Sequence, residues 1–196
     1  MQFPADAAQR MRAGVRAAQR LFFALWPDAP MRARLAAAVS PLRASHPAAG
    51  RWLDPAGYHL TVHFLGDFAP LPPQLVVQAC AAADSVDVPA FSLRLDRAGS
   101  FGNRDIPWWL GCAVPPPALV ELWRQLGSAL DRAGVPRESR RDFVPHLTVL
   151  RGARAAPAVT VLEPLAWPVD AFVLLAGAAA PAARDYRLLR RFTLRD

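Results

Sequence analysis

The sequence contains no lysine, so its 23 basic residues are all arginines. This absence excludes ligases that form a lysyl-adenylate, Schiff-base enzymes and NTPases with a Walker A loop, because each of them needs a lysine amine. With 16 acidic residues, the formal net charge is +7. Any anion held by a basic side chain of this protein must therefore meet a planar, permanently charged guanidinium group.

Cysteine and long hydrophobic runs are also scarce. Cys80 and Cys112 are too few for a disulfide framework or a zinc site. No run of 18 apolar residues is present, and the first 20 residues lack the apolar centre of a secretory signal. We therefore expect a cytoplasmic protein that makes no contact with a membrane.

Proline, by contrast, is abundant, with 20 residues in 196 against a usual share of roughly 5%. The 53% hydrophobic content is enough for a core, and the prolines divide the chain into short elements.

We interpret residues 1–19 as a tail or a short helix, and 20–196 as a single domain. The apolar patterns predict helices at 28–44, 72–83 and 117–133, and strands at 20–27, 58–65, 91–95, 108–114, 144–150, 171–176 and 186–194. Because strands and helices interleave, the class is α/β or α+β.

The tetrapeptide His-Leu-Thr-Val occurs twice, at residues 59–62 and at 146–149, an offset of 87 residues (146 minus 59). Two of only four histidines therefore occupy the first position of this repeated tetrapeptide. Each copy follows a turn-prone segment and enters an apolar strand. This repetition predicts a duplicated fold with two related halves.

Strand alternation decides which of these side chains can meet. It puts His59 with Thr61 on one face of the first strand, and His146 with Thr148 on one face of the second. The opposite face of the first strand would enter a helix-covered core with Leu60, Val62 and Phe64. If a two-fold axis relates the halves, both polar pairs face a single cleft.

Two imidazoles that face each other suit phosphodiester chemistry. A neutral imidazole can take a proton from an attacking water, and a protonated one can give a proton to the leaving oxygen. Threonine hydroxyls can stabilise the charge that builds up on the non-bridging phosphate oxygens. The rival use of His59 and His63 as metal ligands fails on a strand, where the two lie about 13 Å apart.

The segments HLTVHFLG and PHLTVLRG resemble the paired His-x-Thr motifs of the 2H phosphoesterase superfamily. The branch they resemble is that of the bacterial and archaeal RNA 2′,3′-cyclic phosphodiesterases, also named 2′-5′ RNA ligase family proteins. The resemblance extends from about residue 20 to 194 and includes the opening RLFFALWP. It implies a bilobal α+β fold, with two pseudo-symmetric halves that each bring an antiparallel sheet and flanking helices to a central cleft.

The resemblance also implies hydrolysis of a terminal 2′,3′-cyclic phosphate to a 2′-phosphate, with no metal or other cofactor. By the family pattern, His59 donates a proton to the departing 3′ oxygen and His146 activates water, although the two roles could be exchanged. Thr61 and Thr148 would bind the phosphate and Arg151 would assist. The resemblance places Phe64 near the nucleotide, whereas alternation assigns it to the core.

Other readings remain open at this stage. The same site could act as a 2′-5′ RNA ligase or on small cyclic nucleotides, or the cleft could bind RNA without turnover. His63 shares the predicted face of His59, either at the cleft floor or in catalysis. One of Trp108 and Trp109 could stack a base, and the loop with Arg137, Arg140 and Arg141 could steer RNA. We expect RNA ends or small nucleotides as substrates, no obligate protein partner and a monomer.

Overall fold

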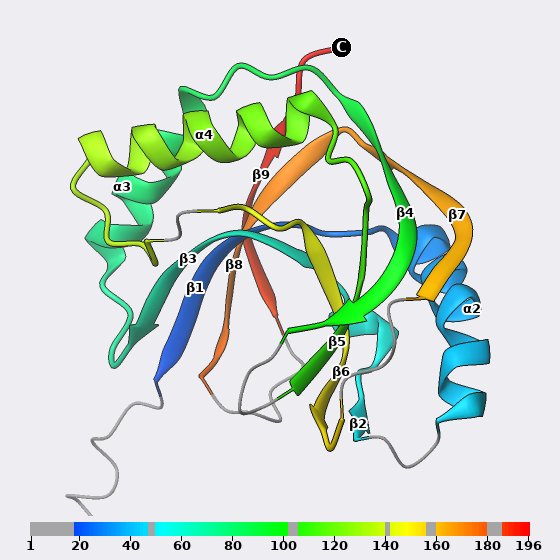
Figure 1. Ribbon diagram of the computed structural model, residues 1–196. Helices are drawn as coiled ribbons and strands as arrows, with labels where there is room; N and C mark the ends of the chain where they lie inside the picture. The colour runs from blue at the N-terminus through cyan, green and yellow to red at the C-terminus, as the bar shows by residue number, and fades with distance from the viewer. Residues whose placement is uncertain (1–17, 47–49, 102–105, 140–141, 156–159, 180–185) are drawn as a thin grey trace, which may run out of the picture.

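The computed structural model describes residues 18–46, 50–101, 106–139, 142–155, 160–179 and 186–196 (Figure 1). Residues 1–17 of the predicted tail lie outside the described residues, and Gln19 already belongs to the first strand. The elements in chain order are β1 (Gln19–Leu25), α2 (Ala29–Ser45), β2 (Arg51–Trp52), the 3₁₀ turn η1 (Pro55–Gly57), β3 (Leu60–Phe68), α3 (Pro73–Asp84), β4 (Phe91–Ser100), β5 (Ile106–Gly111), α4 (Pro117–Arg132), β6 (His146–Ala153), β7 (Thr160–Val169), β8 (Ala171–Ala178) and β9 (Arg187–Thr193).

The strands form one sheet in the order β7-β4-β5-β6-β3-β1-β8-β9, and the short β2 pairs with β6. Every pair of named strands is antiparallel. The two central strands, β3 and β6, share a single register pair, Leu60 with Leu147. The predicted α+β antiparallel architecture is confirmed. Its two predicted sheets, however, are the two halves of one continuous sheet, joined at this narrow contact.

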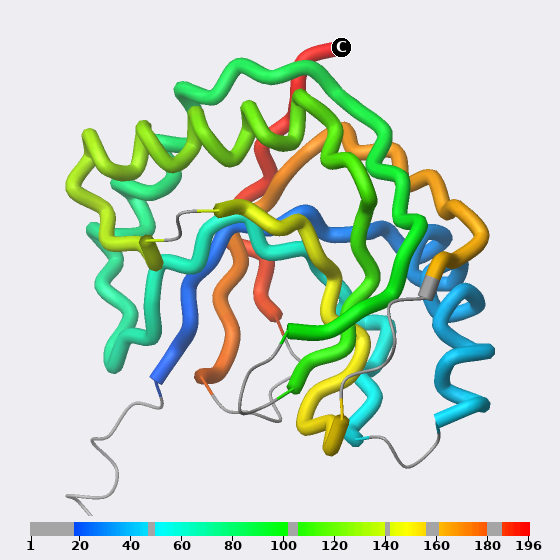
Figure 2. The backbone as a smooth tube through the Cα atoms, in the orientation of Figure 1, coloured from blue at the N-terminus to red at the C-terminus, as the bar shows by residue number. Residues whose placement is uncertain are grey.

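The chain path shows the same unit twice (Figure 2). The unit β1–α2–β3 pairs its two strands, and so does the unit β5–α4–β6. Each connecting helix crosses to the other half of the sheet, since α2 packs on β7 and α4 packs on β3 and α3. Figure 1 accordingly shows α3 and α4 together on one side and α2 on the other. The predicted internal duplication is thus present in the strand pairing around each copy of the His-Leu-Thr-Val motif.

Local sequence signals define the helices. Asp28 caps α2 by accepting a hydrogen bond from the Met31 amide at 2.8 Å. Helix α4 buries a stripe of leucines and ends before Gly134, whose φ of 66° places it in the left-handed region that favours glycine. No helix in the described ranges is long and apolar enough to cross a membrane.

The main core lies between the sheet and its helices, whereas a smaller apolar cluster lies on another face of β1 and β8. Alternation along β1 sends Leu21 and Phe23 into the main core and Phe22 and Ala24 into the small cluster. Phe64 and Tyr186 pack against the small cluster. This second face of β1 forms part of the site described next.

Candidate active site

Both copies of His-Leu-Thr-Val contain a β-bulge at the same position, the valine. In β3, Thr61 pairs with Ala24 and His63 with Phe23, so the residue between them is extra. In β6, Thr148 pairs with Trp109 and the residue two further on pairs with Trp108, so Val149 is extra in the same way. A bulge inserts one unpaired residue and reverses the alternation that follows it.

The bulges correct two of the sequence predictions. Phe64 does not face the main core as alternation predicted, because the bulge turns it to the face of Thr61, where the resemblance expected it. His63 does not share the face of His59 and is only 4% exposed. In β6 the same shift gives Arg151 an exposed position that lines the cavity.

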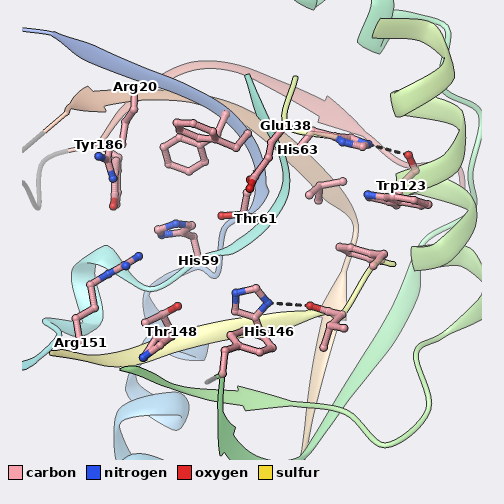
Figure 3. Close-up of a pocket in the computed structure, with 17 residues that line it drawn as sticks. Arg20, His59, Thr61, His63, Trp123, Glu138, His146, Thr148, Arg151 and Tyr186 are labelled. Atoms are coloured by element: carbon pink, nitrogen blue, oxygen red, sulfur yellow. Dashed lines mark hydrogen bonds between the residues drawn. The ribbon is translucent and has the colours of Figure 1, made fainter. Parts of the chain in front are cut away.

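A cavity of about 250 Å³ lies where the two halves meet (Figure 3). The structure brings all six predicted site residues to its lining: His59, Thr61, Phe64, His146, Thr148 and Arg151. Lining residues that sequence reasoning did not assign to the site include Arg20, Phe22, Phe101 and Glu138. These come from β1 and from the segments after β4 and α4, whose approach to the cleft depends on tertiary pairing.

The two catalytic candidates are held in the same way. Nδ1 of His59 donates to the Gly57 carbonyl at 2.8 Å, and Nδ1 of His146 donates to the Val144 carbonyl at 2.8 Å. A carbonyl oxygen only accepts, so the proton of each neutral ring resides on Nδ1 and the lone pair on Nε2. Each Nε2 can therefore serve as the proton-transferring atom.

Aromatic rings fix the orientation of both imidazoles. The His59 ring lies 5.0 Å from Phe22 and 4.9 Å from Tyr186, centroid to centroid. The His146 ring meets the edge of Phe101 at 4.8 Å. These contacts limit rotation of each ring about its side-chain bonds, so the direction of each Nε2 is set before a ligand binds.

The surroundings of His59 strongly favour its neutral form. Burial is the largest cause that lowers the pKa of His59 from 6.5 to about 4. The hydrogen bond to the Gly57 carbonyl opposes this shift, whereas the charges of Arg151, His146 and Arg20 add to it. An anion bound beside His59 would oppose the part of this shift that comes from the positive charges and would favour the protonated ring.

His63 makes structural contacts between β3 and α4. Its Nε2 donates to the Trp123 carbonyl at 2.8 Å, and its ring stacks on Trp123 at 5.7 Å. A Cβ on Gly127 would come within 3.1 Å of the imidazole, so glycine makes room for it. Burial lowers the pKa of His63. The residue lines one end of the cavity, apart from the facing pair (Figure 3).

The remaining predicted contacts are resolved in part. Trp108 is in the core, and Trp109 does not line the cavity but packs at 5.4 Å from Phe101, the ring that holds His146. Arg137 is paired with Asp131 at 2.7 Å. Residues 140 and 141 lie outside the described residues.

Comparisons with known proteins agree with this geometry. A family model for the 2′-5′ RNA ligase superfamily matches residues 27–180. A protein of Escherichia coli (strain K12) named RNA 2′,3′-cyclic phosphodiesterase is 35% identical over 181 residues, covering 90% of this chain and 97% of that protein. One of the same name from Thermus thermophilus is 33% identical over 194 residues, covering 90% of each.

Solved structures of the same kind of protein resemble this chain as well. The crystal structure of E. coli LigT complexed with 3′-AMP has a TM-score of 0.77 and 33% identity, covering 91% of this chain and 99% of that one. The duplicated His-x-Thr cleft is thus found in a chain that matches the family model over most of its length. This protein belongs to the 2′-5′ RNA ligase superfamily of 2H phosphoesterases.

Proposed function

We propose that the protein is an RNA 2′,3′-cyclic phosphodiesterase that opens a terminal cyclic phosphate and leaves a 2′-phosphate. One observation carries the proposal: two His-x-Thr pairs from separate strands line one cavity, and each imidazole is held through Nδ1 in the same way. The relatives from E. coli and T. thermophilus bear the name of this activity.

In the proposed reaction, His146 Nε2 takes a proton from water as the water oxygen bonds to phosphorus. The bond from phosphorus to O3′ breaks, and His59 Nε2 gives its proton to O3′. Thr61 and Thr148 donate hydrogen bonds to the non-bridging oxygens, and Arg151 adds positive charge where negative charge develops. After release, exchange with solvent returns the two rings to their starting states.

The lowered pKa of His59 fits the donor role only with substrate bound. The cyclic phosphate is an anion, and it counters the charges of Arg20 and Arg151 that disfavour a protonated ring. A ring that is a weak base in the free protein is also a strong acid once protonated, which favours release of its proton to O3′. Substrate binding and proton loading of His59 are therefore coupled.

The size of the cavity suits the reacting group and its immediate surroundings. Its volume of about 250 Å³ lies just below the roughly 300–1,000 Å³ of most small-ligand sites. We therefore expect it to receive the reacting nucleotide alone, with any preceding RNA outside. The single-domain organisation, the monomeric state and the cytoplasmic location remain predictions.

The test is incubation with a 5′-labelled oligoribonucleotide that ends in a 2′,3′-cyclic phosphate, with and without EDTA. We expect conversion to a 2′-phosphate in both conditions, slowed by about two to four orders of magnitude in His146→Ala. A 3′-phosphate product would reverse the assignment of the leaving oxygen. Binding without turnover would support an RNA-binding module, and a longer product formed with added 5′-hydroxyl RNA would show ligation.

A further inference from the structure

The cavity is lined differently on either side of the two facing histidines. On the side of His59 it is lined by Arg20 and Tyr186, and on the other side by His63 and Trp123 (Figure 3). The Trp123 ring stacks on Phe143 with centroids 5.5 Å apart and planes within 6° of parallel. The end beside His59 thus carries a cation and a hydroxyl together with the rings of Phe22 and Tyr186, whereas the other end is a stack of His63, Trp123 and Phe143.

Arg20 has no part in the proposed proton transfers, yet it lies in the cavity wall. Its position on β1 shares the face of Phe22 and Ala24, which is the cavity face. Its Nε is buried and has no hydrogen-bond acceptor in the part of the chain that the structure describes. The Asp67 carboxylate forms an ion pair at 3.7 Å, too far from Nε for a hydrogen bond. The Arg20 side chain as a whole is 29% exposed, so an anion that enters the cavity can approach a guanidinium group that has only this loose ion pair in the described part of the chain.

The chemistry of ribose indicates which anion this is, and this step rests on the proposed function. When the 2′,3′ edge of a ribose lies between the histidines, C1′ with its base and C4′ with its 5′ group project to opposite ends. O3′ is attached next to C4′, so the residue that protonates O3′ is on the side of the 5′ group. His59 has that role in the proposed reaction, and it contacts Tyr186 at 4.9 Å.

We propose that Arg20, with Tyr186 beside His59, forms a second anion subsite that binds the phosphodiester preceding the terminal nucleotide. The end with Trp123 and Phe143, where the described lining includes no arginine, is then left for the base. The enzyme would thereby distinguish an RNA chain end from a free nucleoside cyclic phosphate, although both carry the same reacting group.

The test compares two substrates that differ only at the 5′ position. One is adenosine 2′,3′-cyclic phosphate with a free 5′-hydroxyl, and the other carries a methyl phosphodiester there. We expect the wild-type protein to show a kcat/KM at least about tenfold higher on the diester, the size of one charged hydrogen bond. Arg20→Gln should bring the ratio close to one, mainly through KM, and Arg20→Lys should restore part of it.

Asp67→Asn is the matched control, because it removes the ion pair and leaves the guanidinium in place. It should keep the wild-type preference for the diester. If Asp67→Asn loses the preference as fully as Arg20→Gln, or if Arg20→Gln slows both substrates equally, Arg20 supports the fold or the reacting phosphate and the subsite is refuted. Equal wild-type rates on both substrates also refute the subsite but leave the proposed function intact, whereas turnover of neither refutes both.

Discussion

The two copies of His-Leu-Thr-Val, in β3 and in β6, are alike up to the bulge and differ after it. Both anchor the imidazole through Nδ1 on the carbonyl two residues earlier, and both place a threonine on the cavity face. After the bulge, β3 continues with His63 and Phe64, and β6 with Leu150 and Arg151. The shared part supplies two equivalent proton carriers, and the divergent part makes the surroundings of the reacting phosphate unequal.

The residues that differ between the copies give the two histidines different surroundings. Arg151 follows the second copy, whereas an aromatic ring, Phe64, occupies the corresponding position after the first. The wall beside His59 comes from Phe22 and Tyr186, and that beside His146 from Phe101. A duplicated scaffold can therefore hold two copies of one side chain and still assign them different roles.

The largest expected effect comes from removing either imidazole. His59→Ala and His146→Ala should each lower kcat on an RNA cyclic phosphate by about two to four orders of magnitude, the usual contribution of general acid or base catalysis. Steady-state kinetics measures this loss, and circular dichroism checks the fold. A variant with wild-type turnover would show that its copy has no part in the chemistry.

The threonines should come next. Thr61→Val and Thr148→Val remove one hydroxyl at nearly constant volume, and each should lower kcat/KM by about ten- to a hundredfold, the range for a hydrogen bond to a charged group. Thr→Ser at the same positions is the control, since it keeps the donor. Loss in the serine variants equal to that in the valine variants would mean that the methyl group, and hence packing, matters instead.

Replacing Arg151 tests how the charge that follows the second copy affects the histidine of the first. Arg151→Gln removes a positive charge that lowers the pKa of His59, so this pKa should rise from about 4. An NMR titration of the His59 ring protons in the free protein measures this pKa directly, and KM should increase because the phosphate loses a positive partner. A His59 pKa that stays in place, with KM unchanged, would contradict the electrostatic effect of Arg151 on this half of the site.

The smallest effect is expected where the first copy is made more like the second. His63→Leu introduces the residue that the second copy has at this position, Leu150. It removes the hydrogen bond to the Trp123 carbonyl, so the free energy of unfolding should fall by about 0.5–1.5 kcal/mol in a urea titration. Turnover should stay within a few-fold of wild type, and a loss as large as that of His59→Ala would give His63 a catalytic role.

The sequence was sufficient to identify the repeated motif and to predict the pattern of strands and helices around it. The histidines and threonines could be predicted because they precede the bulge, where simple alternation holds. Phe64 and His63 follow it, and their faces depend on register with β1, which a single strand does not reveal. Strand β7 was not predicted because Pro164 and Pro168 interrupt its pattern, and the structure accommodates both prolines in a strand at the edge of the sheet. Arg20 reaches the site only through the pairing of β1 with β3.

The most direct test is the rate of the double variant His59→Ala/His146→Ala, measured beside both single variants on one cyclic-phosphate oligonucleotide. If both rings serve one reaction at a single phosphorus, the double variant should be little slower than the slower single variant, because residues acting as a unit are not additive. Losses that multiply across the two positions would mean that the two copies act independently, and the account of a single shared site would be wrong.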